Sequence, residues 1–155
     1  MGSRDGARNL VVTTARGIIK NNIFHRAVAS TTGTSLFQIS TESLASTDID
    51  YNNWGGASVA WLVGPSHRTS DADFRNLVQA TAGASNETHS LNADPQFVLS
   101  FSDLHLRSTS PARQAGTDFG AVGWAPSRYD YSCDLWSVAS CTPRPAGRWS
   151  AGAYQ

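Results

Sequence analysis

The sequence has little charge and no long hydrophobic run. Of its 155 residues, 15 % are charged, and twelve basic and twelve acidic side chains cancel to a net charge of zero. The chain therefore lacks the basic footprint of a protein that binds nucleic acid or an acidic membrane surface. No apolar run approaches the roughly 18 residues that span a bilayer. We expect neither nucleic acid nor a membrane as a partner.

Cysteine and histidine are too sparse, and wrongly spaced, for the familiar metal and redox motifs. Cys133 and Cys141 fit neither a zinc site nor a CxxC motif, and the four histidines lack HxH or i, i+4 pairs. We expect no metal and no cofactor. The two cysteines form either a local disulfide or two buried thiols, and we predict the disulfide, which favours an oxidising compartment.

The composition indicates a folded domain with a polar and weakly charged surface. Hydrophobic residues make up 40 % of the chain, and it holds five Trp, 13 Gly and 33 Ser plus Thr. The length suits one domain. We expect residues 1–8 to be disordered or added in cloning, because they are short and polar and show no signal-peptide pattern. Residues 9–155 form the domain, with coils over 9–66, a helix and closing motifs over 67–120, and an aromatic tail over 121–155.

Short β-type runs dominate the first third of the chain, separated by Gly, Ser, Thr and Asn. They cover residues 10–13, 17–24, 35–40 and 48–54. In the last run Ile49 and Tyr51 alternate with Asp48, Asp50 and Asn52, which predicts a half-buried strand with the polar side chains outward.

A weak internal repeat links two of these runs. The segment from Lys20 to Phe24 resembles the segment from Asp50 to Trp54, thirty positions later, and each has an Asn-rich step before an aromatic residue. Long-period repeats of short strands and polar turns are typical of a β-solenoid with stacked parallel coils. The repeat therefore predicts an all-β fold, a short right-handed parallel β-helix.

One segment has helical spacing. Ser70 supplies an N-cap hydroxyl with Asp73 three residues on, Phe74 and Val78 lie on one face, and Gly83 follows the end. This pattern predicts one flanking α-helix over residues 71–81.

The ordered motifs of the chain resemble the C-terminal portion of right-handed parallel β-helix proteins. The relatives indicated are the pectate-lyase-like superfamily, including bacterial surface proteins of the choice-of-anchor Q type. The motifs run from residues 21–24 and 51–54 through 88–91, 93–98, 103–106 and 110–112 to 115–116 and 152–154. The resemblance implies a secreted or cell-surface protein that acts on polysaccharide or oligosaccharide. It carries over no catalytic residues.

Three charged residues are candidate catalytic groups. Asp48 and Asp50 lie about 6.6 Å apart along one strand face, which falls in the range of about 6.5–9.5 Å that inverting glycosidases use. Lys20 would stack beside Asp50 at about 4.8 Å if the repeat is one coil. Lys20 and Asp50 then form either a lyase base with its electrostatic partner or a surface ion pair, and the two aspartates alternatively cap a turn.

Three function classes stay open. The first is a glycoside hydrolase or polysaccharide lyase that uses Asp48, Asp50 or Lys20. The second is a carbohydrate-binding module, with Trp54, Trp61 and Asn52 as candidate substrate contacts. The third is a structural or assembly segment of a larger surface protein. The chain is also expected to form a homo-oligomer through its N-terminal coil, because that coil would expose strand edges and apolar side chains.

Overall fold

The structure is a computed structural model, and it describes residues 10–12, 16–25, 35, 37–55, 61–99 and 103–117. The predictions for the N-terminal segment 1–8, for the aromatic tail 121–155 and for the disulfide between Cys133 and Cys141 lie outside these residues. They remain predictions.

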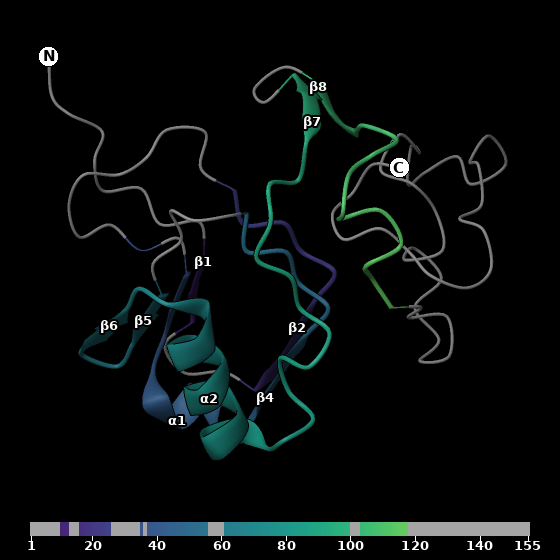
Figure 1. Cartoon of the computed structure of the whole chain (residues 1–155). Coiled ribbons are helices and arrows are strands. Elements are labelled where there is room, and N and C mark those ends of the chain that lie inside the picture. Colours follow the sequence, from purple (N-terminus) through teal and green to yellow (C-terminus); the bar gives the residue numbers. More distant parts are fainter. Residues whose placement is uncertain are drawn as a thin grey trace, which may run out of the picture.

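Within the described residues the chain forms eight short strands and two helices (Figure 1). In chain order they are β1 (Leu10–Val12), β2 (Gly17–Lys20), β3 (Phe37–Ile39), α1 (Thr41–Leu44), β4 (Thr47–Asp50), β5 (Trp61–Val63), β6 (Ser66–Arg68), α2 (Asp71–Ala82), β7 (Phe97–Leu99) and β8 (Asp103–Leu106).

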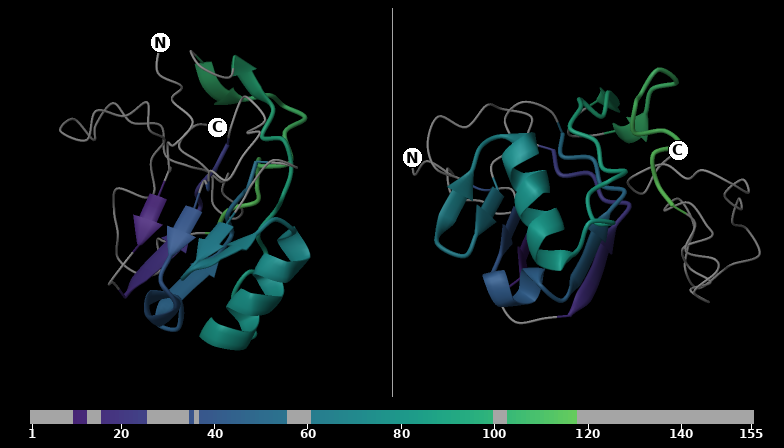
Figure 2. Two further views of the ribbon diagram at one scale, coloured as in Figure 1. Left: turned by 90° about the vertical axis from the view of Figure 1, so that its left-hand side faces the viewer. Right: turned by 60° about the horizontal axis from the view of Figure 1, so that its bottom comes forward.

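The strands belong to three separate small sheets. The first has the order β1-β3-β5-β6, in which β1, β3 and β5 are parallel and β6 is antiparallel to β5. The three parallel strands lie side by side in the left view of Figure 2. The second sheet pairs β2 with β4 in parallel, and the third pairs β7 with β8 antiparallel. The β7–β8 hairpin lies at one end of the described chain in Figure 1, where Phe97 packs edge-on against His25, 5.5 Å between ring centroids.

The prediction of a short right-handed parallel β-helix is wrong. The described strands have three or four residues each, they fall into separate sheets, and two of their pairings are antiparallel. The physical reason is the turn at Gly64 and Pro65, which connects β5 to β6. Gly64 adopts a φ of +55°, which glycine tolerates without strain, so β6 folds back on β5 after two residues. The first sheet therefore ends in a hairpin where a further parallel strand was expected.

The predicted helix is confirmed as α2, one residue longer than expected. Ser70 Oγ accepts a hydrogen bond from the backbone N–H of Asp73 at 3.2 Å, which satisfies one of the free N–H groups of the first turn. Phe74 and Val78 are buried, as the spacing requires. The short helix α1 was not predicted, because one helical turn is too short to show a period.

An aromatic cluster forms the core between α2 and the strands. Phe74 stacks on Trp61 with ring centroids 4.8 Å apart, and Trp54 stacks on Phe24 at 4.6 Å. Phe37 contacts three of these rings edge-on or tilted. Each such ring pair contributes about 0.5–1.5 kcal/mol beyond the burial of its area. The core therefore holds α2 against the strands, and the segment that follows α2 runs along β4, where Glu87 N donates to Ile49 O.

Candidate functional site

The β2–β4 ladder brings the three predicted catalytic residues to one place. Its register pairs Ile18 with Asp48 and Lys20 with Asp50, so the thirty-residue offset expected from the repeat is present in this ladder. Lys20 Nζ forms its ion pair with Asp48 Oδ2, at 2.7 Å, and not with Asp50. Only 18 % of the Lys20 side chain is exposed, whereas 50 % of the Asp48 side chain is exposed.

Asp50 is buried, although the strand pattern predicted it to point outward with Asn52. Only 5 % of its side chain is exposed. Tyr51 has a φ of 56°, which ends the extended strand directly after Asp50. Residues 86–91, which we name the covering loop, then pack beside β4 and cover both Asp50 and Asn52.

The Asp50 carboxylate is held by four hydrogen bonds. Oδ1 accepts from the backbone N–H of Tyr51 at 2.9 Å and from that of His89 at 2.7 Å. Oδ2 lies 2.8 Å from His89 Nδ1 and 3.3 Å from Thr88 Oγ1. A carboxylate offers only acceptors, so these contacts fix its orientation and require a proton on His89 Nδ1.

His89 presents its other ring nitrogen away from the carboxylate. Its side chain is 56 % exposed, and among the described residues Nε2 has no hydrogen-bond partner. With the proton held on Nδ1, Nε2 of a neutral imidazole carries a free lone pair. The pair is thus a proton acceptor that is oriented by a buried carboxylate.

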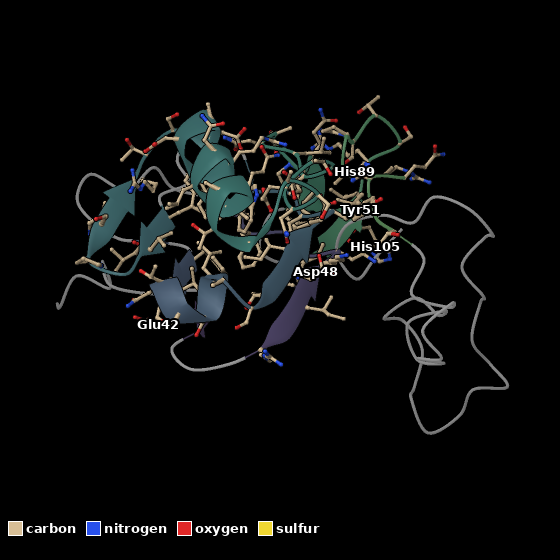
Figure 3. The ribbon with its side chains drawn as sticks, turned by 90° about the horizontal axis from the view of Figure 1, so that it is seen from below. Glu42, Asp48, Tyr51, His89 and His105 are labelled. Carbon is tan, nitrogen blue, oxygen red and sulfur yellow. The ribbon has the colours of Figure 1, made fainter. Side chains whose placement is uncertain are left out.

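Tyr51 fixes the plane of the imidazole. The Tyr51 and His89 rings stack with centroids 4.4 Å apart and an angle of 3° between their planes. Lys20 Nζ lies 5.9 Å from the centre of the Tyr51 ring, within the range of a cation–π contact. Figure 3 shows Asp48, Tyr51 and His89 along the β2–β4 side of the molecule, with Glu42 on α1 away from them.

The predicted substrate-binding residues are all buried. The exposed fraction is zero for Trp54 and Trp61 and 1 % for Asn52. The Trp54 indole N–H donates to Glu87 Oε2 at 2.9 Å, and Asn52 Oδ1 and Nδ2 bond to residues of β2 and its turn. In this structure these side chains build the core and do not offer a surface for a sugar.

His89 is the candidate site residue that the sequence analysis did not assign. Its partner lies 39 positions away, and no motif spacing links the two. The available signal was local: Thr88, His89 and Ser90 are three polar residues beyond a helix end, a common place for functional loops.

Two further observations concern metals and membranes. Within residues 10–117 as far as they are described, no group of three or more His, Cys, Asp or Glu side chains is placed to hold a metal ion. None of the described helices has the length and apolar character needed to cross a membrane.

Comparison with known proteins identifies no relative: no family model, no curated protein and no solved structure matches the chain. The resemblance to pectate-lyase-like proteins therefore stays a prediction from the sequence motifs.

Proposed function

We propose that the protein acts on a polysaccharide by proton transfer at His89 Nε2, with Asp50 as the residue that orients the imidazole. The observation that carries the proposal is the 2.8 Å contact between the Asp50 carboxylate and His89 Nδ1, with the carboxylate buried and the imidazole exposed. General acid–base catalysis needs a group of this kind, held within hydrogen-bond reach of its substrate.

The charge around His89 favours a neutral, hydroxyl-rich substrate. Lys20 is paired with Asp48, so this ion pair leaves little positive charge for an acidic sugar or a phosphate. Elimination from an acidic sugar needs a cation to offset the sugar carboxylate, whereas hydrolysis needs a base for the attacking water. We therefore favour hydrolysis, in which His89 Nε2 accepts a proton from the attacking water as the water oxygen bonds to the sugar carbon, and returns that proton to the sugar oxygen that departs when the glycosidic bond breaks.

The pair Asp48 and Asp50 does not carry the proposal. A hydrolase with two catalytic carboxyls needs both to reach the sugar, one on each side of the bond that breaks. Asp50 is nearly inaccessible and its oxygens are occupied by backbone and side-chain donors. Asp50 is assigned to positioning, and Lys20 with Asp48 to the polar rim of the site.

An assembly segment is the second candidate, and one observation favours it. The strand order leaves β1 at the edge of its sheet, because in the described residues β1 pairs with β3 alone. An edge strand can accept a strand from another chain. The predicted homo-oligomer and the predicted secreted or cell-surface location belong to this candidate as much as to the first.

The deciding experiment measures reducing ends and unsaturated products released from a panel of neutral and acidic polysaccharides. We expect reducing ends from a neutral polymer, and a loss of at least about 10²-fold in turnover for His89→Ala and Asp50→Asn. His105→Ala is the matched control, since it removes an exposed histidine on β8. No product from any polymer with the folded wild-type chain, together with a concentration-dependent oligomer in light scattering, would replace the first candidate by the second.

A further inference from the structure

The covering loop is fastened to β4 and the turn after it by a row of hydrogen bonds. Glu87 N donates to Ile49 O at 2.8 Å, His89 N donates to Asp50 Oδ1 at 2.7 Å, and Leu91 N donates to Asn52 O at 2.7 Å. The position of His89 therefore depends on how tightly this loop is held.

Glu87 belongs to this loop, and its side chain is completely buried. Its Oε2 accepts from the Trp54 indole at 2.9 Å, and its Oε1 accepts from Ser90 Oγ at 2.9 Å. The backbone of Glu87 has a φ of 56°, a conformation that non-glycine residues seldom adopt. The carboxyl group thus joins the loop to the aromatic core through two neutral donors.

The charged groups around Glu87 do not neutralise it fully. Arg75 on α2 donates to the backbone carbonyls of Glu87 and Ser90 and to Asp71 Oδ2, so its hydrogen bonds bypass the Glu87 carboxyl group. From β4, Asp50 adds a like charge, and His89 pairs with Asp50. Burial raises the pKa of Glu87 to about 7, although Trp54, Ser90 and Arg75 each oppose the rise.

We propose that Glu87 is a pH-operated latch, which holds the covering loop against β4 while it carries a proton and loosens the loop when the proton leaves. While Glu87 is protonated, one carboxyl oxygen accepts from the Trp54 indole and the other donates its proton to Ser90 Oγ, whose hydroxyl can rotate. The buried carboxylate that forms when the proton leaves has only these two neutral donors and is repelled by Asp50, so water must reach it and the loop loosens from β4. The latch uses contacts of the fold and does not rest on the proposed reaction.

The sequence makes a direct test possible, because Glu42 and Glu87 are its only glutamates. Labelling glutamate with ¹³C gives two carboxyl signals, and Glu42, exposed on α1, is the internal reference. We expect the Glu87 signal to titrate with a midpoint near 7. Amide exchange of His89 and Leu91, corrected for its intrinsic pH dependence, should become at least about tenfold faster above that midpoint.

Two variants separate the latch from the titration of His89 itself. Glu87→Gln keeps the size of the side chain and removes the titration, so the exchange rates should lose their step, whereas Glu42→Gln should keep it. Ser90→Ala removes one donor to the charged carboxylate, so the midpoint should rise, which gives a second readout if Glu87→Gln does not fold.

Three results would overturn the latch. The first is a Glu87 signal that titrates together with Glu42. The second is a midpoint near 7 with no change in the exchange of His89 and Leu91. The third is a step in exchange that persists in Glu87→Gln. Because no activity is measured, these outcomes leave the proposed reaction to its own test.

Discussion

Two aspartate–histidine pairs in the described part of the chain are alike in chemistry and different in setting. Asp50 and His89 are 39 residues apart in sequence and 2.8 Å apart at their side chains, and the carboxylate is 5 % exposed. Asp103 and His105 are two residues apart on β8, 2.5 Å apart, and exposed by 38 % and 52 %. The first pair is held by tertiary structure, the second by local strand geometry. A short contact alone therefore does not mark a site, since both pairs have one.

What differs is how each carboxylate is fixed. Asp50 accepts backbone N–H groups from Tyr51 and His89, two segments that only the folded chain brings together. Asp103 accepts the backbone N–H of His105, its near neighbour, together with the His105 imidazole. An exposed local pair reforms easily in water, so its loss has little effect on the fold.

The largest difference should appear in stability. Asp50→Ala removes four hydrogen bonds and leaves buried backbone donors without partners, so we expect the free energy of unfolding to fall by about 3 kcal/mol. Asp103→Ala should lower it far less, because this carboxylate is exposed and its partners are its near neighbours. Urea unfolding of both variants at one pH measures the two values, and equal losses would remove the distinction between the pairs.

The two surroundings should also differ in how stability depends on pH. The pKa of Glu87, beside the buried pair, is raised from 4.5 to about 7. Between these values the folded chain keeps a proton that the unfolded chain has lost, so stability falls as the pH rises. The difference between the two pKa values corresponds to a loss of up to about 3 kcal/mol in the free energy of unfolding, and this loss is complete above pH 7. Glu87→Gln should abolish this dependence in urea unfolding curves.

Asp103 should show the opposite sign. The backbone N–H of His105, and then its side chain, lower the pKa of Asp103 in the folded chain. Its stabilising contribution is therefore present above the pKa of an unfolded aspartate, and it is lost as the pH falls through the lowered pKa. Comparing Asp103→Asn with the wild type from neutral to acidic pH isolates this small effect: the stability difference should shrink as the pH falls, and a difference that grows as the pH falls would reverse the assignment.

The smallest effect is expected for Lys20 and Asp48. Half of the Asp48 side chain is exposed, so solvent screens the pair, and Lys20→Ala should change the free energy of unfolding by less than about 1 kcal/mol. The Lys20→Ala, Asp48→Ala double-mutant cycle in urea measures the coupling. A coupling above 2 kcal/mol would show that this pair, too, belongs to the tightly held part of the site.

Local features of the fold could be predicted from the sequence, but the way in which the first sheet ends could not. The N-cap at Ser70 and the helical spacing of Phe74 and Val78 identify α2 because both signals lie within a few residues. The offset between Lys20 and Asp50 follows from the repeat, and the ladder has that register. The parallel β-helix was wrong because the turn at Gly64 reverses the chain, and a turn of two residues leaves no trace in a thirty-residue period.

The candidate site was predictable only in part, for a related reason. Asp50 was singled out, but as an exposed catalytic acid on a regular strand. The covering loop makes it a buried positioning group, through a contact between residues 39 positions apart. Trp54 and Trp61 illustrate the same limit, because aromatic residues in short runs suit a binding face and a core equally well until packing decides.

The proton on His89 tests the central claim most directly. With ¹⁵N-labelled imidazoles at a pH where His89 is neutral, we expect its proton on Nδ1, held by Asp50, and a free lone pair on Nε2. In Asp50→Asn the amide group can donate to Nδ1 and should move the proton to Nε2, while the signals of His105 stay unchanged. A neutral His89 with its proton on Nε2 in the wild type, or the same tautomer in both proteins, would contradict the account.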